Sequence, residues 1–273
     1  MHRRASSFTK MRQDRKAVSP AISTVIITAV TIVLVLVTGT YATQVLERQR
    51  GASEFETVQK TIATFDDALR DVAWKRDSSR STRFTVKYGQ LILYSNLSLR
   101  VNVTDYPSAS YSTVTGFVQY AISTQYITYG DGYESYLLGD NNTLATSSTQ
   151  SSGQCVVRQA GSWLNITLDY RVRALKTYTT TVNGTTVSYV DIWIIKVKVP
   201  HPSAYVNDFD LTARSLNIAA ITFAGAGGNG YAVTGGKCDV KVDLGSYSNT
   251  SSIALDGDKV VFNFLIAEVQ VSM

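Results

Sequence analysis

Residues 15–47 read RKAVSPAISTVIITAVTIVLVLVTGTYATQVLE and decide the fold. A basic stretch ends at Lys16, and no charged residue follows until Glu47. This charge-free run is longer than the roughly 20 residues that span the hydrocarbon core of a bilayer. We therefore expect a membrane-spanning helix near the N-terminus, continued by an amphipathic helix and then by a β-rich exterior domain.

The net charge of +5 belongs entirely to the leader. The remaining residues carry 20 basic and 20 acidic side chains, so they are balanced. Positive charge beside an apolar segment keeps that side in the cytoplasm. The residues beyond the apolar segment have no excess of basic side chains, so nucleic-acid binding is not expected. The leader's charged residues are Arg3, Arg4, Lys10, Arg12, Arg15 and Lys16, against Asp14 alone.

Three kinds of processing fit this N-terminus. A secretory leader would be cut near Thr40-Tyr41-Ala42, but its apolar core is normally only about 7–15 residues long. A signal anchor would not be cut. Cleavage before the apolar run would instead leave that run in the mature protein.

The junction favours the third kind of processing. Lys16-Ala17-Val18-Ser19-Pro20, followed by an apolar run, resembles the class III leader junction of archaeal type IV pilins. The resemblance covers residues 12–46. It implies that a prepilin-type peptidase cuts between Ala17 and Val18, with Lys16 in the recognised junction, and removes residues 1–17. One departure is Ile22, because many type IV pilins have Glu at the fifth mature position.

Residues 18–80 are expected to form one long helix, with an apolar part at 18–46 and an amphipathic stalk at 47–75. Ser19 is a suitable N-cap and Pro20 a suitable first helical residue. The small residues Ser23, Ala29 and Gly39 would let neighbouring helices approach closely. The side chains expected to form a shared assembly core are Pro20, Ile22, Ile26, Ile27, Val30, Val33, Leu34, Leu36 and Val37.

The stalk carries an apolar stripe with helical spacing. Its members are Phe55, Val58, Ile62, Phe65, Leu69 and Val72. A coiled-coil seam would look similar, but only two to three heptads are present, so we expect the stripe to dock on this chain's own β domain. The pairs Glu56–Lys60, Asp66–Arg70 and Asp71–Lys75 are expected on the remaining surface, and the helix is expected to end near Arg76–Ser81.

Residues 81–273 alternate β-type runs with turn signals, which predicts an antiparallel sandwich or barrel-like fold, immunoglobulin-like in architecture, and an α+β fold class overall. Asn183-Gly184 and Asp256-Gly257 are two-residue hairpin signals, and Gly130-Asp131-Gly132 is expected to form a further turn. The clearest runs are Arg83–Tyr88, Gln90–Tyr94, Leu97–Thr104, Trp163–Tyr170, Val187–Val199, Ser215–Phe223, Lys237–Leu244 and Lys259–Val271.

Two features are typical of an exported chain. Cys155 and Cys238 could form one disulfide in an oxidising exterior, or remain two buried free thiols. Six Asn-x-Ser/Thr sequons indicate an N-glycosylated surface, although strands rich in Ser and Thr also produce sequons by chance. The sequons are at Asn96, Asn102, Asn141, Asn165, Asn183 and Asn249.

Residues for catalysis or cofactor binding are scarce. His201 lies between two prolines, so a nucleophilic triad would depend on one loop histidine. Asp208/Asp210 and Asp256/Asp258 could supply Ca²⁺ ligands, but acidic residues in turns are usually solvated. Residues 225–230 match G-x-G-x-x-G without a helix after them, which argues against dinucleotide binding. We therefore expect no enzymatic activity, metal or cofactor.

The leading hypothesis is a structural subunit of an archaeal type IV-like pilus used in surface adhesion. Its precursor would be inserted in the inner membrane and its mature form would be extracellular. Its partners would be copies of itself, the peptidase, the pilus assembly machinery and glycans or other surfaces. The alternative is a membrane-anchored extracellular solute- or glycan-binding module.

Overall fold

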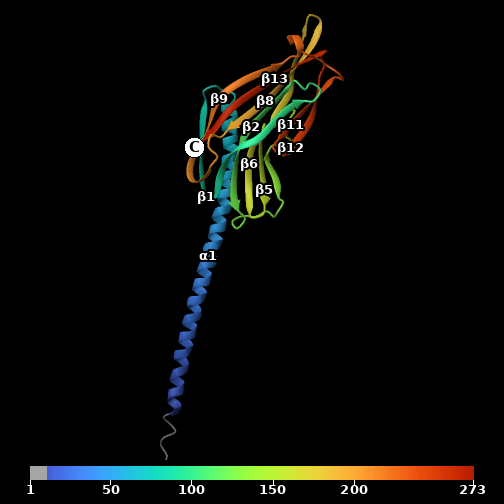
Figure 1. Cartoon of the computed structure of the whole chain (residues 1–273). Coiled ribbons are helices and arrows are strands. Elements are labelled where there is room, and N and C mark those ends of the chain that lie inside the picture. The colour runs from blue at the N-terminus through green and yellow to red at the C-terminus, as the bar shows by residue number, and fades with distance from the viewer. Residues whose placement is uncertain (1–10) are drawn as a thin grey trace, which may run out of the picture. The chain divides into compact units, whose positions relative to one another are not determined.

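A computed structural model describes the backbone of residues 11–273 and the side chains of residues 22–273. The chain divides into two units, Met1–Arg50 and Gly51–Met273. Helix α1 (Met11–Ala73) begins in the first unit and ends in the second, and all strands belong to the second (Figure 1). A long helix followed by a large, mostly β region confirms the coarse α+β prediction.

Both ends of α1 differ from the sequence prediction. The helix already includes residues 11–17, so Ser19 does not begin it in the full-length chain. Removal of residues 1–17 would place Ser19 and Pro20 at its start, where a missing proline N–H costs nothing. At the other end the helix stops at Ala73, before the predicted Arg76–Ser81. The Ser78 hydroxyl donates to the Lys75 carbonyl oxygen at 2.6 Å, and Asp77 has a positive φ of 56°.

The strands form a single hydrogen-bonded network of thirteen strands. They are β1 (Ser79–Val103), β2 (Ser110–Ser123), β3 (Glu134–Leu138), β4 (Leu144–Ala145), β5 (Gly153–Ala160), β6 (Trp163–Tyr170), β7 (Val172–Val182), β8 (Thr185–Lys198), β9 (Ala204–Phe223), β10 (Tyr231–Ala232), β11 (Lys237–Leu244), β12 (Tyr247–Ala254) and β13 (Lys259–Ser272). A short 3-10 turn, η1, covers Ala226–Gly228.

The main strand order is β3-β5-β6-β2-β1-β9-β13-β8-β7-β4, and β11 pairs with β1 and β12. Most pairs are antiparallel. Two pairs, however, run parallel: the short β4 with β7, and β8 with β13 from Lys259↔Val187 to Gln270↔Lys198. The expectation of an all-antiparallel sheet is therefore wrong, because the C-terminal strand inserts between β9 and β8 in this direction.

Two hydrophobic cores lie on opposite faces of the sheet. Along β13, Phe262 and Phe264 belong to one core, whereas Ala267 and Val269 belong to the other. Successive side chains of a strand point to opposite faces of the sheet. The change from even-numbered to odd-numbered core residues therefore means that the two cores lie on opposite faces of β13. In β1 the change coincides with an extra residue between Tyr94 and Leu97, where the register to β2 shifts.

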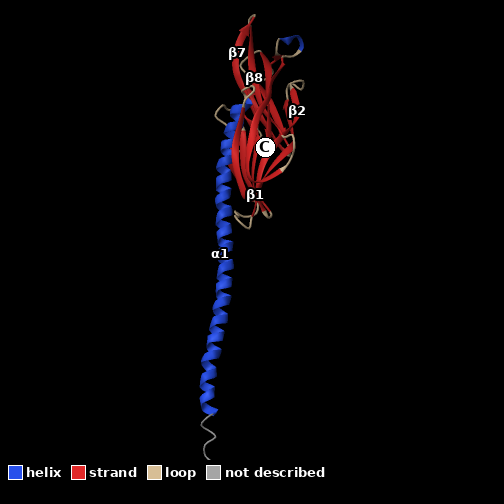
Figure 2. Ribbon diagram, turned by 90° about the vertical axis from the view of Figure 1, so that its left-hand side faces the viewer, coloured by secondary structure: helices blue, strands red, loops and turns tan. Residues whose placement is uncertain are grey.

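Residues 51–73 of α1 cover one face, whereas the β11–β12 hairpin helps enclose the core on the other face. Strands β7 and β8 continue beyond the last turn of α1 (Figure 2). The face that α1 covers in one half of the sheet is thus not covered by α1 in the other half.

The turn predictions had mixed outcomes. Asn183-Gly184 joins β7 to β8 with positive φ at both residues, which confirms that hairpin. Asp256-Gly257 does not make one, because β12 pairs with β11 and β13 pairs with β8, β9 and β10. A turn forms at Gly130, whose carbonyl oxygen accepts from the Tyr133 amide at 3.2 Å. The three earliest predicted β runs are parts of the single strand β1.

Candidate functional site

The apolar half of α1 has no covering partner within the described part of the chain. From Ile22 to Leu46 its large hydrophobic side chains are 48–70% exposed, except that of Val45, which is half-buried. This exposure includes every predicted assembly residue whose side chain is described: Ile22, Ile26, Ile27, Val30, Val33, Leu34, Leu36 and Val37. Pro20 and the junction residues Lys16, Ala17 and Val18 lie outside the described side chains.

Three threonines of this segment bond their hydroxyls to the backbone of their own helix. Thr28 donates to the Thr24 carbonyl oxygen and Thr31 to that of Ile27, each at 2.8 Å. Thr40 makes the same kind of bond one turn back, at 2.9 Å. Because these three hydroxyl groups bond to the helix backbone, they can enter an apolar environment without becoming unsatisfied donors.

Among the described residues, one helix is long and apolar enough to cross a membrane, starting at Ile22. The most apolar stretch of this helix is not buried within the protein. A helix of this kind near the N-terminus can serve as a membrane anchor or a signal.

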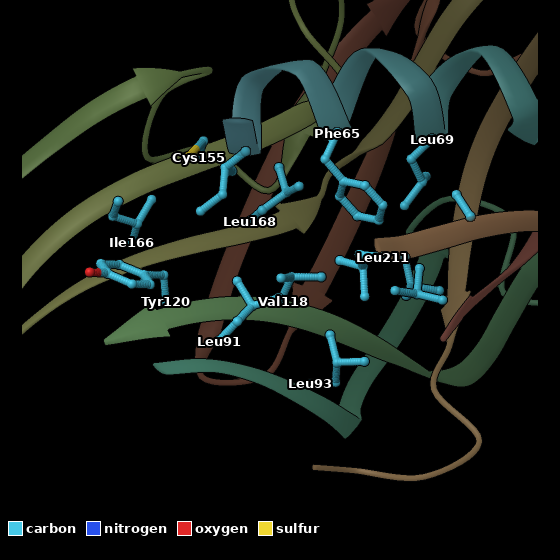
Figure 3. Close-up of a cluster of buried hydrophobic side chains, with 14 of the residues drawn as sticks. Phe65, Leu69, Leu91, Leu93, Val118, Tyr120, Cys155, Ile166, Leu168 and Leu211 are labelled. Atoms are coloured by element: carbon cyan, nitrogen blue, oxygen red, sulfur yellow. The ribbon is translucent and has the colours of Figure 1, made fainter. Parts of the chain in front are cut away.

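The stripe on residues 51–73 is buried against the sheet of the same chain. Phe55, Val58, Ile62, Phe65, Leu69 and Val72 are at most 1% exposed and belong to one core with strand residues. Figure 3 shows Phe65 and Leu69 pointing from the helix toward Leu168, Leu211 and Val118. Phe65 also makes an edge-to-face contact with Phe84, with ring centroids 6.1 Å apart. The stripe therefore docks α1 on its own β domain, as the sequence predicted.

Glu54 fastens the helix to β1 beside the start of the stripe. Its carboxylate accepts hydrogen bonds from the Lys87 amide at 2.7 Å and from the Tyr88 and Gly89 amides at 3.1 Å. The Tyr120 hydroxyl donates to the same carboxylate at 2.8 Å. The three amides lie where the β1–β9 register breaks, and Gly89 is the first residue of the β1–β2 pairing. Glu54 was not among the residues predicted to attach the helix, although it precedes Val58 by one helical turn.

The predicted Asp66–Arg70 ion pair forms, but the prediction that it lies on the exposed surface is wrong for Asp66. Its side chain is fully buried and accepts from Arg70 Nε at 2.8 Å. Burial raises the pKa of Asp66, and the Arg70 charge acts in the opposite direction. Gly153 is needed here, because a Cβ at this position would lie 2.3 Å from Asp66 Oδ1. Of the other predicted pairs, Asp71–Lys75 forms.

Asp169 is a second carboxyl group in a poorly solvated site. Its Oδ1 is buried without a hydrogen-bond partner in the described part of the chain, and the residue lines a small cavity with Arg158 and Tyr247. Burial raises the pKa of Asp169 to about 7, despite the opposing charges of Arg158 and Arg171. The folded protein therefore favours a protonated Asp169 in mildly acidic solution.

Asp169→Asn should remove one pH-dependent loss of stability. Because the folded-state pKa is raised from 3.8 to about 7, the unfolded state releases its proton first, and stability falls as pH rises from 4 through 7. Asp169 is partly exposed, so the expected effect is reduced accordingly. On going from pH 4 to pH 8, the free energy of unfolding of the variant should rise by about 2 kcal/mol relative to that of wild type. Urea unfolding at both pH values measures this difference. If the difference in stability between variant and wild type were the same at both pH values, Asp169 would not be a buried carboxyl group that stays protonated in the folded protein.

The predicted disulfide is not formed. Cys155 and Cys238 are free, buried, and in opposite cores of the sheet. Burial raises the pKa of each thiol to about 12, which makes both poor nucleophiles at neutral pH. The alternative of two buried free thiols is the one observed.

The sequons differ in accessibility. Asn96, Asn141 and Asn183 are exposed, whereas Asn102, Asn165 and Asn249 are partly buried. Asn249 also has a structural role, because its Oδ1 accepts from the Thr143 amide at 2.9 Å and its Nδ2 donates to Asn142 at 3.2 Å. A glycan on Asn249 would compete with the second of these bonds.

The remaining acidic and glycine motifs serve the fold. Asp256 pairs with Lys176, and Asp258 accepts from the Thr186 amide at 2.9 Å. The described residues contain no group of three or more His, Cys, Asp or Glu side chains that could hold a metal. The glycine motif forms η1 and its flanking turns instead of leading into an α-helix.

No protein-family model, curated protein or solved structure matches this chain. The site must therefore be judged from its own chemistry. That chemistry consists of an apolar helical segment available for association and a second helical segment attached firmly to a β domain.

Proposed function

We propose that this chain is a structural subunit of an extracellular archaeal type IV-like pilus that polymerises through the apolar half of α1 and acts in surface adhesion. The observation that carries the proposal is the contrast along one helix: residues 22–44 are exposed on all sides, while the stripe from Phe55 to Val72 is buried. The class III-like junction at Lys16-Ala17-Val18 supports it.

The physical basis is that two different environments can cover the apolar half of α1. Exposed aliphatic surface is unfavourable in water by about 25 cal/mol per Å². Lipid can cover it in the precursor, and neighbouring helices can cover it in a filament. Removing the cationic leader would eliminate the charges that hold the N-terminus at the cytoplasmic face. Helices of many copies could then pool in a central bundle.

In this proposal the β domain forms the outer wall and has no catalytic role. Docking through the stripe and Glu54 would transmit force from the wall to the helix core. The exposed sequons would carry glycans on the exterior. The proposal includes an immunoglobulin-like wall only in the sense that the β domain is layered. Polymerisation through α1 does not depend on the strand topology of this domain.

The central test is the state of the mature protein. N-terminal sequencing should give Val18 as the first residue, and the protein should sediment as polymers from sheared cell surfaces. A monomer released only by detergent would favour the membrane-anchored binding module. A mature chain that lacks residues 22–46 would exclude both.

Lys16→Ala combined with Ala17→Leu should block processing, because the junction would lose its cation and its small residue. We expect a precursor about 17 residues longer than the mature chain that stays in the membrane fraction and yields no sheared polymer. Immunoblotting of membrane and shear fractions measures both effects. Normal filaments from this variant would overturn the assigned junction.

A further inference from the structure

One face of the β7–β8–β13 sheet stays open beyond the last turn of α1. Arg173 on β7 lies opposite Trp193 on β8, and Trp193 lies opposite Leu265 on β13. Cross-strand partners share a face. On the same face of β13, Ala267 and Val269 are covered by α1. The helix ends at Ala73, and Figure 2 shows β7 and β8 continuing beyond that end. Trp193 lines the same cavity as Trp74, the first residue after the helix.

A cavity of about 340 Å³ occupies the boundary between the covered and open halves. Its size falls in the range of small-ligand sites. Two indole rings, Trp74 and Trp193, contribute to its wall, and Trp74 is 38% exposed. The other lining residues are Ser152, Arg173, Leu175 and Ile195. Aromatic rings combined with a few polar groups suit a ligand that has both a flat apolar face and hydrogen-bonding edges.

Arg173 brings a positive charge without a carboxylate partner to this cavity. Its Nε is buried and has no hydrogen-bond partner among the described residues, while Nη2 donates to the Gln150 carbonyl oxygen. Its neighbours are matched, since Arg70 pairs with Asp66 and Arg171 pairs with Asp140. Burial lowers the pKa of Arg173, and the charges of Arg70 and Arg171 lower it further. A bound anion would relieve this unbalanced charge.

The same face continues as a row of polar and aromatic groups. Asn263 donates to Asp191 at 2.8 Å and accepts from Thr222 at 3.0 Å. Farther along, Tyr178 and Tyr189 are cross-strand partners whose rings stack with centroids 4.3 Å apart. The face therefore offers ring surfaces and hydrogen-bonding groups over a longer distance than one cavity.

We propose that this open face binds an acidic oligosaccharide, with the carboxylate of a uronic acid on Arg173 and a pyranose ring against Trp74 and Trp193. Nε is buried and Nη2 also donates to Gln150, so the two terminal nitrogens, Nη1 and Nη2, would bind the carboxylate in two hydrogen bonds. The apolar C–H face of a pyranose matches an indole. The balanced charge beyond residue 17 argues against nonspecific capture of polyanions, so selectivity must come from the site itself.

The test uses the full-length chain in detergent micelles, with binding followed by calorimetry and tryptophan fluorescence. The probes are a galacturonic acid tetrasaccharide and a neutral glucose tetrasaccharide. We expect saturable binding of the acidic probe and at least tenfold weaker binding of the neutral one. Arg173→Gln and Trp193→Ala should each weaken the acidic probe at least tenfold, and Arg173→Lys should have an intermediate effect.

Trp163→Ala is the matched control, because Trp163 is a 46% exposed tryptophan on β6, outside this face. It should bind like wild type, and unchanged thermal unfolding should show that each variant folds. Absence of saturable binding would overturn the proposal. So would equal binding of both probes, or an equal loss in Trp163→Ala. The assay needs no polymer, so its failure leaves the filament proposal intact, and a failure of polymerisation leaves this site intact.

Discussion

Val35→Asp should abolish filaments while leaving the β domain folded. Val35 is 65% exposed in the apolar half of α1, where polymerisation would bury it among other helices. An unpaired carboxylate in such an environment costs several kcal/mol, on the order of 3 or more, and every subunit would contribute that cost. The expected result is complete loss of sheared, sedimenting polymer. Immunoblotting of shear fractions and electron microscopy measure it.

Two observations separate an assembly defect from a failure to enter the membrane. A single Asp near the middle of a spanning helix costs about 3 kcal/mol on insertion scales, which a long apolar run can offset. The variant should therefore still reach the membrane and lose residues 1–17. Val35→Leu conserves apolar character and should assemble. Normal polymer from Val35→Asp would show that this side chain is not packed in a filament core.

The sequence was most informative where the signal was periodic and local. The stripe from Phe55 to Val72 has helical spacing, and a stripe too short for a coiled coil must pack on its own domain. Asn183-Gly184 specifies its hairpin because the two residues readily adopt positive φ. In both cases neighbouring residues contain the information.

Nonlocal pairing was not predictable in this way. Asp256-Gly257 has turn chemistry, but that chemistry does not determine which strands pair on either side of it. The parallel pairing of β8 with β13 joins segments about 70 residues apart, and each segment would read as a strand in either direction. The two cysteines likewise remain unpaired because they lie in the cores on opposite faces of the sheet, which their spacing in the sequence does not reveal.

The polar anchors illustrate an intermediate case. Asp66 lies four residues after Ile62 and three before Leu69, so helical geometry places it on the buried face. Charge alone led to the expectation of a surface pair. The Arg173–Trp193 juxtaposition is of a different kind, because it exists only through the β7–β8 register. Sequence periodicity can find the first sort of residue and not the second.

Glu54 is the residue where loss of one side chain should most weaken the attachment of α1 to the sheet. Its carboxylate accepts from three backbone amides and from the Tyr120 hydroxyl. Removing an acceptor leaves partly buried donors unsatisfied, which costs more than the net value of the hydrogen bonds. Tyr120 is fully buried and its ring lies 6.3 Å from that of Phe55, so the disturbance reaches the core.

Glu54→Ala should therefore lower the free energy of unfolding by about 3 kcal/mol, and Glu54→Gln by about 2 kcal/mol, because the amide keeps one acceptor. Urea unfolding of the full-length chain in detergent, followed by near-ultraviolet circular dichroism, measures both values. Glu56→Ala is the control: Glu56 is exposed two residues along the same helix, and its loss should change stability by less than about 0.5 kcal/mol. If Glu54→Ala behaved like Glu56→Ala, the stripe alone would hold the helix, and the four hydrogen bonds would contribute nothing to the attachment.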